Sequence, residues 1–338
     1  MSNGSAYADA RLRACELLKS NLVWDNHACM PLRPADRSFL PQLERFRAVG
    51  ADVVSLNIGY GEDSLESHFR MVASFRQWIA ENADRYCVVS TTSGIDQAVG
   101  SGKLAVTFDI EGMAILNQGD HGLIEAFYDL GVRWMLIAYN RNNVVGGGCH
   151  DVDAGLTTFG RDVLAEMKRV GMVVCCSHTG HRTAHDVIAA ADNPVIFSHS
   201  NPSALARHAR NIPDDLIDAC ARSGGVIGIN GIGWFLGHNA GRPENVAACI
   251  DHVVQRVGPD HAAISLDFIF DQEEMTEILA TRRNSFPDPA AYAGELNILE
   301  PEGLPDVVAN LLLKGYGDGD IAKVLGGNWR RVADQVWR

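Results

Sequence analysis

The sequence predicts a (β/α)8 barrel of the TIM type with additional helices at its carboxyl-terminal end. Short runs rich in apolar and β-branched residues alternate with segments of helical periodicity. The runs typical of strands cover residues 22–24, 52–58, 104–110, 134–139, 172–176, 194–197, 226–229 and 262–266. The segments typical of helices include residues 39–48, 123–129, 160–169, 183–191, 213–221 and 246–257. Eight strands that alternate with helices are the number that closes this barrel.

The length and composition fit one domain. The chain has 338 residues, of which 46% are hydrophobic and 21% are charged, so one large core can be built. We expect a single barrel domain over residues 1–338, with an amino-terminal helix at about residues 1–20 and a helical extension at about residues 269–338. No internal repeat or linker rich in Pro, Gly and Ser divides it.

Local signals mark two helix boundaries. Asn211 precedes Pro213 and two acidic residues, which predicts a cap, a proline and favourable charges at a helix start. Gly171 follows the basic end of the helix at residues 160–169 and predicts a glycine stop there.

The charge and the cysteines limit the partners and the location. The formal net charge of −13 is dispersed along the chain, which argues against nucleic-acid binding and favours small molecules or peptides. Residues 1–20 lack the apolar core of a signal peptide, and no run approaches the roughly 18 apolar residues of a membrane span. The eight cysteines, mostly within apolar runs, have no spacing typical of a disulfide framework. We therefore expect reduced thiols, a cytoplasmic location and no membrane partner.

Polar side chains follow several of the predicted strands. Carboxyl ends of the strands converge on one face of such a barrel, and that face carries the active site. Histidines together with carboxylates in these positions suit zinc, which binds imidazole nitrogen and carboxylate oxygen. The residues at the ends of the first, third, fifth, sixth and eighth strands are Asp25 and His27, Asp109 and Glu111, His178, His199, and Asp267.

These residues belong to an ordered series of motifs that resembles the membrane (renal) dipeptidase family of zinc peptidases. The resemblance runs from about Val23 to the end of the chain. The motifs are Asp25-x-His27, Ile110-Glu111-Gly112, residues 155–160 (GLTTFG), Ser177-His178, residues 197–200 (FSHS), residues 210–215 (RNIPDD) and Leu266-Asp267-Phe268.

The resemblance implies a zinc dipeptidase with two metal ions, in which His27 binds the first ion, Glu111 bridges both, and His178 with His199 binds the second. A hydroxide that bridges two cations has a lowered pKa and attacks the substrate carbonyl. The family also suggests tolerance of a D-residue at the carboxyl end of the dipeptide, and a homodimer is one expected assembly.

Two further roles follow from the resemblance. Arg210 would bind the substrate carboxylate, because guanidinium binds carboxylate bidentately; the alternative is a salt bridge to Asp214 or Asp215. Asp267 would move the proton from the attacking hydroxide to the leaving amine; the alternative is an aspartate that caps a following turn.

The sequence departs from the family at Cys29 and Tyr139. Cys29 occupies the usual place of an aspartate ligand of the first metal, and a thiolate can bind zinc. If Cys29 instead faces away as a buried cysteine, a single metal held by His178, His199 and Glu111 is expected. Tyr139 occupies the place of a histidine that donates to the developing oxyanion, and its hydroxyl can donate the same bond or belong to the core.

Three functional hypotheses remain open from the sequence. The first is the zinc dipeptidase. The second is a related amidohydrolase that acts on another small amide or a lactone, because Cys29 and Tyr139 alter the metal and oxyanion surroundings. The third is a barrel without catalysis that keeps a partial metal site and binds a ligand.

Overall fold

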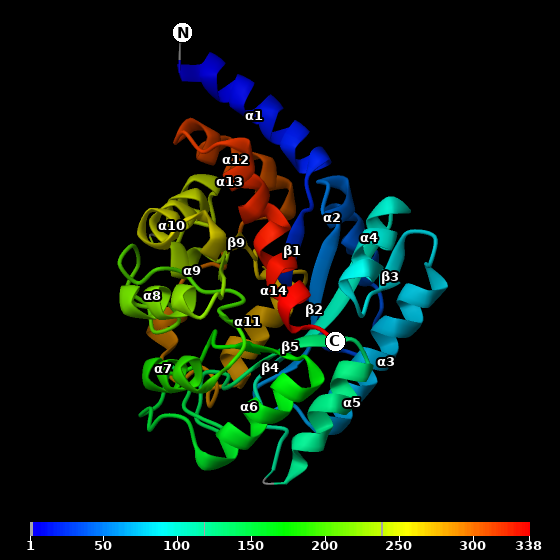
Figure 1. Cartoon of the computed structure of the whole chain (residues 1–338), viewed down its shortest axis with the longest axis vertical. Helices are drawn as coiled ribbons and strands as arrows, with labels where there is room; N and C mark the ends of the chain where they lie inside the picture. Colours follow the sequence, from blue (N-terminus) through cyan, green and yellow to red (C-terminus); the bar gives the residue numbers. More distant parts are fainter. Residues whose placement is uncertain (1–2, 118, 238) are drawn as a thin grey trace.

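The barrel wall is built from parallel strands, as the computed structural model shows for residues 3–117, 119–237 and 239–338 (Figure 1). The main sheet has the order β10-β1-β2-β4-β5-β6-β7, with β3 paired to β4 beside this path, and a second sheet pairs β8 with β9. The strands are β1 Trp24–Cys29, β2 Val53–Tyr60, β3 Tyr86–Val88, β4 Leu104–Glu111, β5 Val132–Leu136, β6 Val173–Cys175, β7 Val195–Ile196, β8 Ile227–Ile229, β9 Ala262–Ile264 and β10 Phe268–Ile269.

An isolated β-bridge and the short strand β10 connect the two sheets into a ring. A parallel bridge between Phe197 and Ile227 joins the end of β7 to β8. On the other side, β10 continues the chain from β9 and pairs with β1 through Ala28 and Phe268. The eighth barrel position is therefore divided between β9, which pairs with β8, and β10, which pairs with β1. The predicted fold class is confirmed.

Helices surround the strands (Figure 1). The α-helices are α1 Asn3–Ser20, α2 Glu44–Ala48, α3 Leu65–Glu81, α4 Thr92–Gly100, α5 Leu123–Asp129, α6 Thr158–Val170, α7 His181–Ala190, α8 Asp214–Arg222, α9 Gly233–Leu236, α10 Pro243–Val257, α11 Gln272–Thr281, α12 Leu304–Leu313, α13 Asp318–Ala322 and α14 Asn328–Val336. Short 3-10 turns cover Leu40–Leu43, Asp120–Gly122, Pro259–His261, Pro289–Tyr292 and Pro301–Gly303, and a π-helical turn covers Lys323–Gly327. None of the described helices is both long and apolar enough to cross a membrane.

The carboxyl-terminal helix covers the end of the barrel opposite the site. Trp329 and Val336 of α14 pack in one apolar cluster with residues at the starts of several strands, including Trp24 and Val53. The Trp329 indole donates a hydrogen bond to the carbonyl of Ile264 at 2.9 Å. The helix α14 therefore covers the amino ends of the strands. The active sites of barrels of this type lie at the opposite end, where the carboxyl ends of the strands meet.

The structure corrects several predicted boundaries. The fourth predicted strand reaches Tyr139, but β5 ends at Leu136, so Tyr139 lies in the loop beyond it. The helical extension is expected to begin at about residue 269, but that residue lies in the strand β10. Much of residues 282–303 forms turns rather than helix. The strand β3 and the helices α3 and α4 are additions to the predicted elements.

The two predicted helix boundaries differ in outcome. Gly171 is the left-handed C-cap of α6 at φ 90°, as predicted. Asn211 is not a cap, because α8 begins after Pro213 without a side-chain cap bond. Its amide instead donates to the carbonyls of Ala206 at 2.8 Å and Phe235 at 2.9 Å, so tertiary partners outcompete the local cap.

Candidate active site

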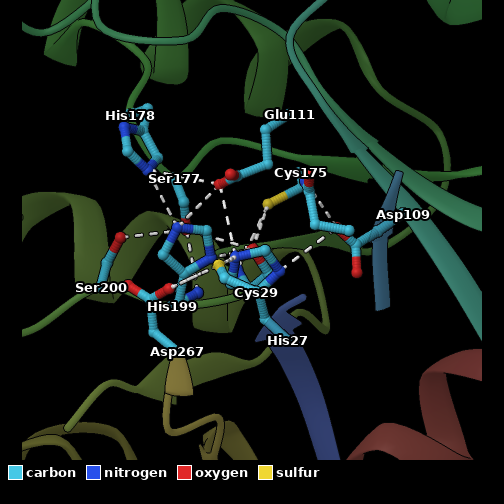
Figure 2. Close-up of polar contacts among 12 residues, drawn as sticks. His27, Cys29, Asp109, Glu111, Cys175, Ser177, His178, His199, Ser200 and Asp267 are labelled. Carbon is cyan, nitrogen blue, oxygen red and sulfur yellow. Dashed lines mark hydrogen bonds and ion pairs between the residues drawn. The ribbon is translucent and has the colours of Figure 1, made fainter. Parts of the chain in front are cut away.

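The residues expected at the strand ends lie together at the carboxyl end of the barrel, where their side chains point toward one another (Figure 2). They come from elements that are far apart in the sequence. His27 and Cys29 lie on β1, Glu111 ends β4, His178 follows β6, His199 follows β7, and Asp267 lies between β9 and β10.

One group of possible metal ligands consists of the imidazoles of His178 and His199 and the carboxylate of Glu111. The Nε2 atoms of His178 and His199 are 3.0 Å apart. Glu111 Oε1 lies 3.4 Å from His178 Nε2 and 3.1 Å from His199 Nε2. The three side chains are almost completely buried, so solvent does not separate them.

Hydrogen bonds at the Nδ1 atoms orient both histidines, and for a neutral His178 ring they place the lone pair on Nε2. His178 Nδ1 lies 2.7 Å from Asn140 Oδ1, an atom that can only accept. His199 Nδ1 lies 2.8 Å from Ser198 Oγ, which also accepts from Cys175 Sγ and donates toward another serine. Burial, followed by nearby positive charges, lowers the pKa of both histidines well below its usual value. A neutral His178 ring with this partner directs its Nε2 lone pair toward Glu111.

The second group contains the unusual cysteine. Cys29 Sγ lies 3.4 Å from His27 Nε2 and 3.5 Å from Asp267 Oδ1. His27 Nε2 lies 3.6 Å from Glu111 Oε1 and 3.4 Å from Asp267 Oδ1. The Cys29 thiol therefore points into the cluster. This orientation excludes the alternative in which Cys29 faces away from the site. Burial raises the pKa of Cys29 well above its usual value, so a thiolate at neutral pH requires a cation beside the sulfur.

Asp109 lies behind His27, which belongs to the second group. Its Oδ1 lies 3.2 Å from His27 Nδ1, although the N–H direction is outside hydrogen-bond alignment. Ser55 Oγ donates to Asp109 at 2.6 Å and Asn57 Nδ2 donates at 3.2 Å. The sequence places Asp109 at a strand end but does not reveal this role, which depends on the pairing of β2 with β4.

Asp25, the first residue of the Asp-x-His motif, has a structural position. Its Oδ1 accepts from the backbone N–H of Leu266 at 3.0 Å and lies 3.4 Å from the N–H of His27. Burial raises the pKa of Asp25 to about 7. Asp25 therefore links β1 to the chain directly before Asp267.

The cluster fits a metal ion. Glu111 Oε1 is buried without a hydrogen-bond partner in the described structure, and burial raises the pKa of Glu111 to about 8. A cation beside Glu111 would favour its charged carboxylate form and oppose the effect of burial. Imidazole nitrogen, carboxylate oxygen and sulfur are the ligand atoms that zinc accepts, and Glu111 is shared by both groups.

Strained backbone also marks the site. His178 and Asp267 adopt left-handed conformations at φ 59° and φ 56°, and Asn140 does so at φ 59°. Few residues other than glycine adopt this region, and each such residue costs on the order of 1–3 kcal/mol. Residues held in this way are characteristic of functional sites.

Arg210 has open donors inside the adjoining cavity. Its side chain is 2% exposed, and its Nε and Nη1 atoms have no hydrogen-bond partner in the described structure. Nη2 donates to the carbonyl of His199 at 3.2 Å, and the guanidinium lies 5.4 Å from the ring centre of Phe235. The alternative salt bridges are wrong, because Asp214 pairs with Arg256 and His252, and Asp215 with His185.

Tyr139 lines the same cavity and stacks on His178 with ring centres 4.2 Å apart. Burial, followed by the charge of Glu111, raises the pKa of Tyr139 well above its usual value, so the phenol keeps its proton at neutral pH. The cavity wall is otherwise largely apolar, and Met30, Leu32, Ile269 and Ile278 contribute to it.

A barrel with a buried histidine and carboxylate cluster at the carboxyl ends of its strands is the architecture of metal-dependent hydrolases. Within that class, the model of the family described as "Membrane dipeptidase (Peptidase family M19)" matches residues 42–279. The chain belongs to this family, and the resemblance seen in the sequence is confirmed.

Curated relatives include two fungal proteins. The chain is 29% identical to dipeptidase verJ of Clonostachys rogersoniana over 277 residues, which covers 81% of this chain and 66% of that protein. It is 28% identical to dipeptidase tcpJ of Claviceps purpurea over 278 residues, which covers 81% of this chain and 60% of that protein. The aligned region therefore spans less than two thirds of both relatives.

Solved structures share the fold over nearly the whole chain. An amidohydrolase from Pseudomonas aeruginosa is 27% identical and superposes with a TM-score of 0.86, covering 96% of this chain and 99% of the other. A metallo peptidase from Rhodobacter sphaeroides, liganded with a phosphinate mimic of the dipeptide L-Ala-D-Ala, is 21% identical. It superposes with a TM-score of 0.77 over 94% of this chain and 99% of the other, which supports the fold.

Proposed function

We propose that this protein is a zinc-dependent dipeptidase. The observation that carries the proposal is the buried Arg210, which lines the same cavity as Glu111, His178 and Asp267 and whose Nε and Nη1 have no hydrogen-bond partner in the described structure. A buried guanidinium with unpaired N–H groups is suited to bind a carboxylate, and a free dipeptide carries a carboxylate one residue from its amide bond. A metal cluster beside a carboxylate site is therefore suited to cleavage of that amide.

We propose that the chain holds two zinc ions. His178, His199 and Glu111 would hold one ion, and His27, Cys29 and Glu111 would hold the other. When bound, zinc supplies Lewis acidity toward the amide carbonyl and lowers the pKa of water, which makes it a nucleophile at neutral pH. If Cys29 remains a thiol, the group of His27, Cys29 and Glu111 loses a ligand and one ion is the expected content.

The protein's own groups orient the substrate. Arg210 would bind the terminal carboxylate bidentately and thereby place the amide bond beside the metal cluster. Tyr139 would donate a hydrogen bond to the carbonyl oxygen as negative charge develops there. Because the phenol keeps its proton, it can act as this donor at neutral pH.

Asp267 would move the proton. Its carboxylate is 6% exposed and lines the cavity, and its contacts are with His27 and Cys29 rather than with a following turn. An ionised carboxylate at this position can accept a proton from the nucleophile and return it to the leaving amine.

The substrate we propose is a free dipeptide that can carry a D-residue at its carboxyl end. The Rhodobacter sphaeroides protein, which has the same fold, was solved with a mimic of an L,D dipeptide. The apolar wall of the cavity in this chain favours an uncharged side chain on the substrate.

Metal content measured together with hydrolysis of a panel of L,L and L,D dipeptides tests the proposal. We expect about two equivalents of zinc per chain, loss of hydrolysis after chelation, and recovery when zinc is restored. Metal binding without dipeptide turnover would instead favour another small amide or a lactone as substrate. A chain that binds no metal and remains inactive after zinc or manganese is supplied would exclude metal-dependent catalysis.

A further inference from the structure

Asn140 connects a proposed metal ligand to the wall of the cavity. Its Oδ1 lies 2.7 Å from His178 Nδ1, and its Nδ2 donates to the carbonyl of Ser285 at 3.0 Å. The side chain is completely buried. Ser285 is followed by Phe286, and Phe286 and Tyr292 both line the cavity.

The second partner determines the orientation of the amide. The carbonyl of Ser285 can only accept a hydrogen bond, so the atom of Asn140 that faces it must be the NH2 group. Oδ1 must then face His178, and because Oδ1 can only accept, the proton of the neutral ring must be on Nδ1. His178 Nε2 consequently carries the lone pair that faces Glu111 and His199.

The backbone at this position restricts the residue type further. Asn140 has φ 59°, and its carbonyl accepts from the N–H of His150 at 2.8 Å, which holds the turn in place. Glycine, asparagine and aspartate tolerate this left-handed region better than other residues. Of these three, only asparagine has both an acceptor for His178 and a donor for Ser285.

We propose that Asn140 is a positioning residue that fixes the ring orientation and tautomer of His178 and ties them to the segment containing Ser285. The inference rests on the proposed metal-dependent function and adds a residue that the strand-end motifs do not include. Outer partners of metal-binding histidines contribute roughly 10- to 100-fold to metal affinity or activity.

The first test compares Asn140→Gly with Asn239→Gly by zinc titration of the metal-free protein. Glycine retains the left-handed backbone, so the substitution removes the amide without introducing strain. Asn239 is a matched control because it also has positive φ, at 46°, and donates to a backbone carbonyl, that of Glu295 at 2.8 Å. We expect Asn140→Gly to weaken binding of one zinc equivalent by roughly 10- to 100-fold and Asn239→Gly to leave it within threefold of wild type. Equal affinity in the two variants would overturn the proposal.

The conservative variant Asn140→Asp separates the two contacts. A carboxylate still accepts from His178 Nδ1 but cannot donate to Ser285. We expect this variant to recover zinc affinity relative to Asn140→Gly, because the acceptor that sets the tautomer is restored. Zinc binding as weak as in Asn140→Gly, in a variant that remains folded by circular dichroism, would contradict the proposed role.

Nitrogen-15 NMR of histidine-labelled, metal-free protein gives a readout that does not depend on activity. We expect His178, assigned with a His178→Gln variant, to be the Nδ1–H tautomer in wild type and Asn239→Gly, and a mixture in Asn140→Gly. An Nε2–H tautomer in wild type would overturn the inference. Failure of the proposed function is distinguishable, because it would appear as absent zinc binding or dipeptide hydrolysis in wild type, whatever the tautomer.

Discussion

Replacement of Arg210 by methionine tests how the substrate is held. Methionine keeps an unbranched apolar side chain against Phe235 but removes the guanidinium, whose Nε and Nη1 have no protein partner. A free dipeptide would lose two charge-assisted hydrogen bonds, each worth about 1.5–3 kcal/mol. The lower end of that range gives a total loss of about 3 kcal/mol, which corresponds to roughly a 100-fold increase in KM.

The assay measures kcat and KM for a free dipeptide and for the same dipeptide with an amidated carboxyl terminus. We expect the 100-fold loss, to order of magnitude, for the free dipeptide and a much smaller loss for the amide, which lacks the negative charge. Arg256→Met is a suitable control, because Arg256 is partly exposed and pairs with Asp214 and Asp218 away from the cavity. Zinc content must match wild type, since Nη2 of Arg210 also contacts the carbonyl of His199.

An equal loss for the free and amidated substrates would refute the reasoning. It would show that Arg210 supports the site through His199 rather than through the substrate carboxylate. A loss confined to kcat would also contradict the assignment if KM reports substrate binding, because ground-state recognition of the carboxylate then has to change KM.

Three further predictions concern the metal cluster. We expect Cys29→Ala to lose about one of two zinc equivalents and Cys29→Asp to retain both, as measured by metal analysis; unchanged content in Cys29→Ala would show that the sulfur is not a ligand. Asp267→Asn is expected to keep its zinc and remove most of kcat, because an amide cannot accept and return a proton, so wild-type turnover would exclude it as the proton carrier. In the metal-free protein, burial raises the pKa of Glu111 from 4.5 to about 8 and that of Asp25 from 3.8 to about 7, so the folded state binds more protons than the unfolded state between these values. These two groups should therefore contribute a free energy of unfolding that falls as pH rises from about 4.5 to 8, whereas the lowered pKa values of His178 and His199 contribute the opposite sign below about 6.5. The Glu111 contribution is measured as the difference in denaturation midpoint between wild type and Glu111→Gln, and a difference that does not fall as pH rises would contradict its shift.

The barrel could be predicted because its strands are buried on both faces. All eight residues of β4 and all eight of β2 are buried, so each forms a continuous run that stands out from the amphipathic helices. The short end strand β10 has only two residues, Phe268 and Ile269, and is defined by its pairing with β1. No local pattern distinguishes such a strand from a loop.

The residues that gather at the candidate site could be predicted for a similar reason. His27, Glu111, His178, His199 and Asp267 each lie at or near the carboxyl end of a recognisable strand, and parallel strands bring those ends together. The direction of the Cys29 sulfur could not be decided in this way. Alternation along β1 allows both His27 and Cys29 to face the site, but only the neighbouring strands show that Asp267 lies 3.5 Å from the sulfur.

The sequence by itself therefore determined the fold class, the family and the residues that gather at the mouth of the barrel, because these depend on periodicity and on motifs of a few residues. Only the tertiary structure decided that Arg210 is buried with open donors, that Asp109 lies behind His27, and that Asn140 bridges His178 and Ser285. Asn140 and Ser285 are 145 positions apart in the chain. Hydrogen bonds between such residues depend on how distant segments pack, which no local pattern in the sequence encodes.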